Sequence, residues 1–303
     1  LHAYNAALVA IDPNTGEVKA MVGSKDWFAE SSPAGCTPGI DCLFDPKLNV
    51  ATSLPGRQPG SSFKPFAYAV AFNKGYDDSV TLQDEETNFG IWGGKEYIPK
   101  NYDGKFRGPV TIRQALAQSL NIPSIKVLLN LAGIQDSINL AREFGLTTLS
   151  TDASFYGPSL VLGGGEVRLI DLVSAYGVFA TEGNRVPPLS ILKVEDSKGR
   201  VLEENKNVPL RVLSAKVAQL ITSILSDNEA RTPIFGANSL LYFPNEKVAA
   251  KTGTTQEFRD GWVLGYTKGV VVGVWVGNND NSPMNKEPGI VIAGPIWHEI
   301  MRE

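Results

Sequence analysis

Strand-like segments stand at both ends of this chain of 303 residues, and helical segments fill the middle. Near the start, residues 6–11 (AALVAI) and 17–22 (EVKAMV) flank DPNTG, a strong turn sequence, and predict a β-hairpin. Near the end, residues 247–254, 261–266 and 270–276 are rich in β-formers. This order predicts one α/β domain of the α+β type, spanning residues 1–303, whose terminal strands share a sheet.

The middle of the chain has the apolar spacing of helices. A helix begins at Ser61 or just before it and ends at Gly75, with Pro65 in the first turn, where a missing N–H costs little. Thr111 is expected to cap a helix over 111–118. Further helices are predicted from around Pro123 and over 135–144, 169–180, 215–225 and 292–302. Residues 24–50 and 77–108 are interpreted as excursions over the surface.

Composition excludes some classes of function. A net charge of −4 provides no basic surface for nucleic acid. The longest apolar stretch, GVVVGVWVG at 269–277, is about half as long as a membrane-spanning helix. The sequence shows no initiator Met and no signal peptide, so we interpret it as a piece of a longer protein whose export signal lies elsewhere.

Two cysteines, Cys36 and Cys42, lie in the Gly/Pro/Ser-rich stretch SSPAGCTPGIDC. A local disulfide and a pair of reduced thiols are both compatible with this spacing. We favour the disulfide, since a small pinned loop suits an oxidising compartment. A zinc site is not expected, because no other Cys and no nearby His could complete it.

Three short polar motifs follow one another along the chain: SSFK at 61–64, SLN at 119–121 and KTGTT at 251–255. In the first, Ser61 and Lys64 lie three residues apart at the start of the predicted helix, so their side chains fall on one face. The free N–H groups of a helix start favour negative charge on the serine oxygen. A serine needs a base to become a nucleophile, and this spacing assigns that task to Lys64.

A lysine is a base only in its neutral form. At an ordinary pKa of ~10.4, roughly one lysine in two thousand is neutral at pH 7. Lowering that pKa to ~7 requires a preference of about 4.6 kcal/mol for the neutral form. Burial and a second cation supply shifts of that size. We expect Lys251 to be the second cation, provided that the fold brings it close to Lys64.

Each motif alone is a weak signal, since SSFK can simply cap a helix and KTGTT can be an ordinary edge strand. Together and in this order they match the set of β-lactamases and penicillin-binding proteins. That chemistry needs no histidine, in keeping with a chain whose two histidines, His2 and His298, stand near its ends. It also needs no metal and no cofactor, and we expect neither.

Beyond the motifs, the chain resembles the transpeptidase domain of class A (bifunctional) penicillin-binding proteins from about Asn5 to His298. The similar segments are RQPGSSFKPFAYAVA, TIRQALAQSLNIPSIKV, LVLGGGEVRLIDLVSAYGVFATEG, ARTPIFG, KTGTTQEFRDGWVLGY and VGVWVGNND. The resemblance implies the penicillin-binding and serine β-lactamase-like fold, with an antiparallel central sheet, flanking helices and an all-helical subregion. It also implies a membrane anchor and a glycosyltransferase domain upstream, and a location outside the cytoplasm, in the periplasm or on the outer face of the cell membrane.

The same resemblance implies peptidoglycan D,D-transpeptidation. Ser61 would attack the penultimate D-Ala carbonyl of a stem peptide, release the terminal D-Ala and hold the rest as an acyl-enzyme. Lys64 would accept the serine proton, and an amine of a neighbouring strand would then take the acyl group. β-Lactam antibiotics would imitate the D-Ala-D-Ala end and acylate Ser61.

Roles for the other motif residues are implied in the same way. Ser119 would relay a proton to the leaving amine, and Asn121 would bond the substrate amide. The backbone N–H groups of Ser61 and Thr254 would form the oxyanion hole. The third motif would bind the terminal carboxylate of the donor through Lys251, Thr252, Gly253, Thr254 and Thr255.

The chain departs from many relatives at residues 256–258 (QEF), where they have Asn-Asp, so acceptor contacts are not carried over to this loop. We interpret GGGE at 163–166 as a solvated loop, because no Lys-Ser/Thr follows it as in a phosphate loop. Arg259 and Asp260 are interpreted as a structural ion pair. Tyr102 is interpreted as loop packing rather than the border of a substrate groove.

Two other kinds of function stay open from the residues. A D,D-carboxypeptidase or a β-lactamase would send water to the acyl-enzyme. A β-lactam sensor or a non-catalytic penicillin-binding scaffold would keep the motifs without turnover. The resemblance outside the motifs favours the transpeptidase.

Overall fold

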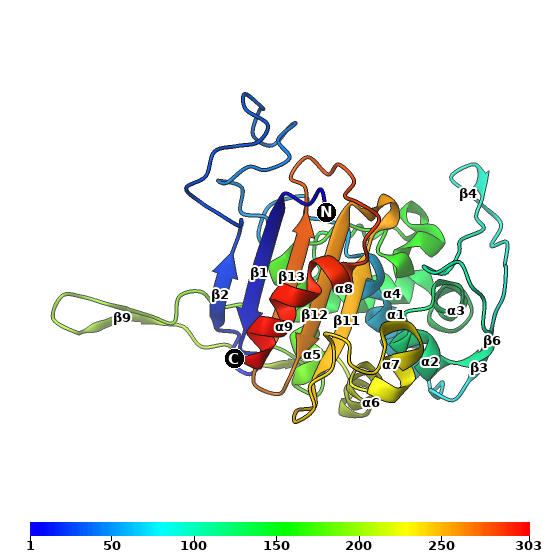
Figure 1. The fold of residues 1–303 in the computed structure, drawn as a ribbon. Helices are drawn as coiled ribbons and strands as arrows, with labels where there is room; N and C mark the ends of the chain where they lie inside the picture. The colour runs from blue at the N-terminus through cyan, green and yellow to red at the C-terminus, as the bar shows by residue number, and fades with distance from the viewer.

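The computed structural model describes residues 1–303 and is built around a five-stranded sheet in the order β11-β12-β13-β1-β2, antiparallel throughout. Its strands are β1 (Asn5–Ile11), β2 (Val18–Val22), β11 (Ala249–Thr254), β12 (Asp260–Tyr266) and β13 (Val271–Gly277). β1 pairs with β13 from Asn5↔Gly277 to Ile11↔Val271, so the two ends of the chain close one sheet (Figure 1). The predicted shared sheet is confirmed.

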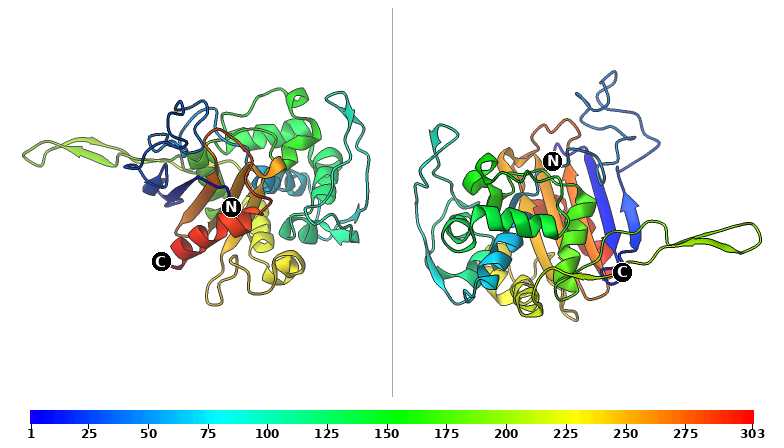
Figure 2. Two further views of the ribbon diagram at one scale, coloured as in Figure 1. Left: turned by 45° about the horizontal axis from the view of Figure 1, so that its top comes forward. Right: turned by 180° about the vertical axis from the view of Figure 1, so that it is seen from behind.

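Helices cover both faces of the sheet. On one face lie α5 (Leu169–Ala180) and α6 (Ala215–Leu225); on the other lie α8 (Gly289–Ile292) and α9 (Gly294–Arg302), as the front and back views show (Figures 1 and 2). Every residue of β12 and β13 is therefore buried. The apolar stretch at 269–277 is explained by this position, because a strand covered on both faces needs no polar side. None of the helices has the length and apolar character needed to cross a membrane.

Most of the remaining helical segments pack against α1 and against one another, with η1 lying on β11, and form the expected helical subregion. α1 runs on directly from a 3-10 turn, so the helix predicted at Ser61 begins there in 3-10 form. Thr111 caps α2 with a capping box, as predicted. The segments are η1 (Gly60–Phe63), α1 (Lys64–Asn73), α2 (Ile112–Ala117), α3 (Asn121–Lys126), the π-helical turn η2 (Val127–Ala132), α4 (Ile134–Glu143), η3 (Ala153–Phe155), η4 (Gly157–Leu162), α7 (Asn228–Phe235) and η5 (Gln256–Phe258).

An aromatic core fixes α1 against the rest of the helical layer. The ring of Phe66 on α1 meets the rings of Phe144, Tyr176 and Phe179 at centroid distances of 5.7–5.9 Å. A second, smaller core lies under α9 on the opposite face of the sheet, around the buried Trp297. Because α1 is held from behind, its first turn has a fixed position beside the edge strand β11.

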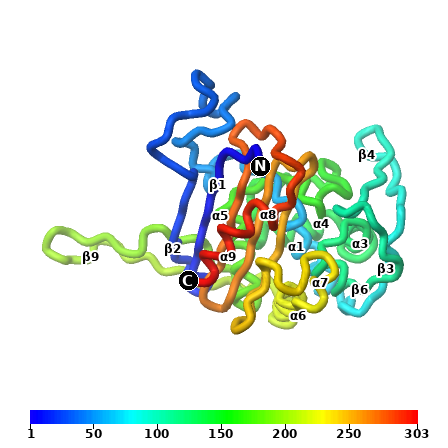
Figure 3. The backbone as a smooth tube through the Cα atoms, viewed as in Figure 1, coloured from blue at the N-terminus to red at the C-terminus, as the bar shows by residue number.

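Short hairpins make up the segments that leave this body. The backbone tube shows an arm that carries β4 and a long ribbon that carries β9 (Figure 3). These strands are β3 (Thr81–Asp84) with β6 (Gly108–Thr111), β4 (Ile91–Trp92) with β5 (Lys95–Glu96), β7 (Asn184–Arg185) with β10 (Leu210–Arg211), and β8 (Lys193–Glu195) with β9 (Val201–Glu204). The expected disulfide between Cys36 and Cys42 is present, with an S–S distance of 2.07 Å.

Candidate active site

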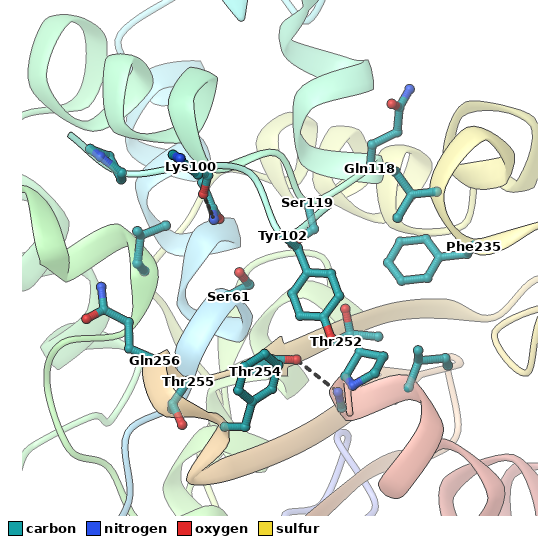
Figure 4. Close-up of a pocket in the computed structure, with 18 of the residues that line it drawn as sticks. Ser61, Lys100, Tyr102, Gln118, Ser119, Phe235, Thr252, Thr254, Thr255 and Gln256 are labelled. Atoms are coloured by element: carbon teal, nitrogen blue, oxygen red, sulfur yellow. Dashed lines mark hydrogen bonds between the residues drawn. The ribbon is translucent and has the colours of Figure 1, made fainter. Parts of the chain in front are cut away.

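A cleft of about 390 Å³ opens between η1, the edge strand β11 and the connection between α2 and α3. Each of the three motifs supplies part of its lining (Figure 4). The predicted site residues in the lining are Ser61, Ser119, Asn121, Thr252, Thr254 and Thr255. The fold therefore brings together residues that are far apart in the sequence.

Ser61 reaches the cleft because glycines allow the backbone at Gly60 to lie directly against the backbone at Gly163 and at Thr254. A Cβ on Gly60 would come within 2.7 Å of the Thr254 carbonyl oxygen, and a Cβ on Gly163 within 2.2 Å of the Gly60 nitrogen. Both glycines have a positive φ, 56° and 79°, which side chains disfavour. The glycine run at 163–165 thus has a packing role behind Ser61, and Glu166 beside it is exposed.

The hydrogen bonding of β11 turns one N–H of the third motif toward Ser61. Thr255 N donates to Asp260 O at 3.1 Å, so Thr255 faces the partner strand β12. Neighbouring residues of a strand point their N–H groups to opposite sides. The N–H of Thr254 therefore faces the open edge of the sheet, where Gly60 and Ser61 lie.

Lys64 is the first residue of α1 and is fully buried behind the cleft. Its Nζ donates to Ser119 O at 2.6 Å, to Leu120 O at 3.1 Å and to Asn121 Oδ1 at 2.8 Å. The Ser119 hydroxyl lies 3.4 Å away. Three acceptors match the three protons of an ammonium group; Ser61 Oγ is not among these partners.

Lys251 approaches the same serine from the opposite side. Its Nζ donates to Ser119 Oγ at 2.7 Å and to Thr252 O at 2.9 Å. Ser119 has a positive φ of 59°, which is uncommon outside glycine and marks a constrained position. This turn points both the carbonyl and the hydroxyl of Ser119 at lysines.

Burial disfavours the charged form of both lysines. Burial, and then the neighbouring charge of Lys251, lower the pKa of Lys64 well below its usual value. Burial, and then the charge of Arg231, lower the pKa of Lys251 to about 7. None of the ion pairs in the structure includes either lysine, so no carboxylate opposes these shifts. The fold thus brings Lys251 close enough to Lys64 to lower its pKa, and the role of Lys251 as the second cation stays a prediction.

Gly253 does not line the cleft, unlike its neighbours in KTGTT. A Cβ at this position would come within 2.3 Å of Pro59 O. The glycine therefore lets the chain before η1 lie directly on the strand. Its position gives it a packing role, and the substrate contact that the resemblance implied stays a prediction.

The segment 99–102 was missed by the sequence analysis. Pro99, Lys100 and Tyr102 line the cleft, although 77–108 was interpreted as a surface excursion and Tyr102 as loop packing. Asn101 holds this segment at the cleft. It is buried, accepts a hydrogen bond from Asn121 N at 2.8 Å and donates to Asp84 at 2.8 Å. A polar residue that ties a loop to a motif carries no distinguishing pattern in the sequence.

The predicted ion pair between Arg259 and Asp260 is wrong. Adjacent residues at the start of a strand point in opposite directions. Arg259 bonds Glu257 at 2.5 Å, whereas the buried Asp260 accepts from Trp275 Nε1 at 2.8 Å. The pKa of Asp260 is raised to about 6, first by burial and against the hydrogen bond from Trp275.

Comparisons with known proteins agree with this geometry. The family model "Penicillin binding protein transpeptidase domain" matches residues 6–302. The chain is 33% identical to penicillin-binding protein 1A of Neisseria lactamica, covering 98% of this chain and 35% of that protein. It is 35% identical to penicillin-binding protein 2D of Bacillus subtilis, covering 97% of this chain and 40% of that protein. The chain thus spans well under half the length of these relatives.

Solved structures show the same fold. The crystal structure of penicillin-binding protein 1A from Haemophilus influenzae superposes with a TM-score of 0.82 at 27% identity, over 99% of this chain and 47% of that one. PonA1 from Mycobacterium tuberculosis gives a TM-score of 0.78 at 27% identity, over 98% and 76%.

The fold and the family match define the class of protein, a penicillin-binding protein transpeptidase, which is a family of serine acyltransferases. The chain belongs to this family. More particularly, it is a transpeptidase domain of the class A type, similar to those of the 1A proteins, as the sequence resemblance implied.

Proposed function

We propose that the chain is a peptidoglycan D,D-transpeptidase that works through an acyl-enzyme on Ser61. The observation that carries this proposal is the convergence of two buried lysines on one hydroxyl beside Ser61. Lys251 Nζ lies 2.7 Å and Lys64 Nζ 3.4 Å from Ser119 Oγ. This arrangement supplies a base, a proton relay and a cation around a single nucleophile.

Acylation begins with the neutral form of Lys64. A neutral amine has two protons and one lone pair, so losing a proton frees one of the three carbonyl acceptors around Nζ. The lone pair then takes the hydroxyl proton of Ser61 while Oγ bonds to the penultimate D-Ala carbonyl carbon. The N–H groups of Ser61 and Thr254 receive the developing oxyanion; such donors contribute about 2.7–4 kcal/mol each in comparable sites.

Release of D-Ala needs a proton on the leaving nitrogen. Ser119 gives its hydroxyl proton to this nitrogen as the C–N bond breaks, and receives a proton from the Lys251 ammonium. The acceptor amine then attacks the ester carbonyl of Ser61 and passes one proton through Ser119 back to Lys251. Ser61 Oγ leaves as the cross-link forms and takes back the proton that Lys64 accepted during acylation. Asn121 orients the substrate amide.

The donor carboxylate is assigned to the KTGTT strand. Thr252 and Thr254 present hydroxyls to the cleft, and Lys251 lies directly behind them. Thr255 lines the same end of the cleft. Cations and hydroxyls at one end of the cleft favour a ligand with a free carboxylate.

The scarcity of acidic side chains in the cleft favours acyl transfer to an amine over hydrolysis. Glu257 is the single Asp or Glu in the lining, and its Oε2 is bonded to Arg259. A lactamase needs a base that activates water beside the acyl-enzyme, and Glu166 is exposed on its loop. No carboxylate therefore stands ready for this task.

We also propose that the protein works outside the cytoplasm, held by a membrane anchor and joined to a glycosyltransferase domain in its full length. The disulfide between Cys36 and Cys42 fits an oxidising compartment. The chain spans 35–40% of the relatives above, which leaves room for such parts in them.

The lifetime of the adduct with a fluorescent penicillin tests the proposed function. An adduct that persists for minutes to hours, together with D-Ala release and amide formation from a D-Ala-D-Ala peptide and an added amine, is expected. Rapid loss of the label would instead indicate a lactamase. A stable label without any turnover of the peptide would indicate a sensor.

A further inference from the structure

A buried arginine outside the three motifs lies behind the cleft. Arg231 on α7 has 2% of its surface exposed. Its guanidinium donates to three backbone carbonyls, those of Leu225, Asp227 and Leu241. These bonds fix the group in place, and no carboxylate forms an ion pair with it, although the charge of Asp227 acts on it from a greater distance.

The nearest candidate for a counter-ion is engaged elsewhere. The carboxylate of Asp227 pairs with Arg113 at 2.9 Å and caps α7, and no carboxylate lies within 4 Å of the Arg231 guanidinium. A buried, unpaired charge is costly to a folded protein. A charge that is kept buried at this cost indicates a role for Arg231 beyond packing.

Arg231 stands one layer of side chains behind the cleft. Arg231 and Lys251 border one small gap behind β11, together with Thr252 and Phe235. Thr252 and Phe235 also line the cleft itself. The charged groups that face Lys251 are thus Arg231 from α7 and Lys64 from α1, with no acidic side chain between them.

We propose that Arg231 is a specificity-determining positioning residue, whose fixed charge acts through Lys251 and Thr252 to make the cleft prefer acyl donors with a free carboxylate. The inference rests on the proposed function and extends it to a residue that contacts no substrate. Arg231 is the third cation of a buried row that also contains Lys64 and Lys251.

The titration of these groups agrees with this role. Burial lowers the pKa of Arg231 to about 10, so the guanidinium is charged throughout the neutral range. The pKa of Lys251, in contrast, is lowered to about 7, so half of its charge is lost near pH 7. The arginine therefore supplies the charge that does not titrate.

The test compares acylation of Ser61 by a penicillin and by the primary amide of the same penicillin. It uses Arg231→Gln, which keeps donors and loses the charge, Arg231→Met, which keeps the volume, and Arg231→Lys, which keeps the charge. Replacing a buried charge by an apolar side chain of similar size is often tolerated, so the Met variant guards against misfolding of the Gln variant. Measurements at pH 6 keep Lys251 protonated in each protein.

We expect the rate constant for the acid to fall about tenfold in Arg231→Gln and Arg231→Met, as for two charges interacting across a protein interior. The rate constant for the amide stays within about twofold, and Arg231→Lys retains most of the preference for the acid. Equal losses for acid and amide, or a Lys variant as weak as the Gln variant, would overturn the inference. Absence of acylation of the unmodified chain by either compound would instead refute the proposed function.

Discussion

Lys251 Nζ donates a hydrogen bond to Ser119 Oγ over 2.7 Å, and this bond joins the edge strand β11 to the connection between α2 and α3. The two walls of the cleft are thereby tied at the residue that is proposed to move protons. A shift of either wall would change the distance between the nucleophile and its relay, so packing far from the cleft sets the geometry of the chemistry.

Replacing Lys64 by Met should slow acylation of Ser61 by penicillin at least about 100-fold, because general-base catalysis contributes roughly 10²–10⁴. Stopped-flow or gel-based labelling measures the rate. The fold should persist, since Met fills the buried volume without a charge. Lys74→Met is the matched control: Lys74 follows the same helix, pairs with Asp136 at 2.6 Å and is partly exposed. Normal labelling of Lys64→Met would show that Lys64 is not the base.

Thr252→Val should reduce acylation by penicillin about tenfold and acylation by its amide less, because a hydrogen bond to a charged group contributes about 1.5–3 kcal/mol. Thr254→Val should show the same selectivity and a lower free energy of unfolding, by about 1 kcal/mol. Thr254 Oγ1 accepts a bond from Gly289 N at 2.9 Å, which Val would break. Thermal unfolding separates the two variants. Equal losses in the acylation rate for the penicillin and for its amide would show that this strand does not bind the carboxylate.

Asp260 should make the protein less stable as pH rises from about 4 to 6. Its folded pKa of about 6 lies above the ordinary value of 3.8, so its contribution is fully present below pH 4 and is lost as pH passes through 6. The total is about 3 kcal/mol. Denaturant titrations of the protein and of Asp260→Asn at several pH values measure this change: the protein should lose stability relative to the variant as pH rises. A gain in stability relative to the variant as pH rises would give Asp260 a lowered pKa instead.

Asn101→Ala should weaken both stability and acylation. The substitution removes two hydrogen bonds from the buried Asp84 carboxylate, which keeps the one from Arg107 N, and leaves Asn121 N without its partner, at a cost of about 2 kcal/mol or more. It also frees the segment that carries Lys100 and Tyr102, so acylation should slow as well. Asn88→Ala, on the exposed part of the same arm, should leave both quantities unchanged. Unaltered acylation by Asn101→Ala would show that the arm does not shape the cleft.

The sequence predicted those parts of the fold that depend on local periodicity. The bounds of α5 and α6 coincide with the predicted helices over 169–180 and 215–225. The single helix predicted over 292–302 is divided at Ala293, between α8 and α9. α7 was not predicted, since its segment NEARTPIF contains Pro233 and few apolar residues at helical spacing.

In the site, the motif residues were predictable because their types carry the chemistry themselves. The partners that position them were not. Asn101, Arg231 and the positive φ of Ser119 depend on contacts between distant segments, and no spacing within one segment reports such contacts. The ion pair predicted for Arg259 failed for a related reason, because neighbours in sequence face opposite sides of a strand.

The most direct test of the account is the intact mass of the chain after incubation with penicillin, followed by mapping of the modified peptide. We predict one added penicillin, located on Ser61, and no adduct on Ser61→Ala. An adduct on Ser119 or another residue, or labelling that persists in Ser61→Ala, would contradict it.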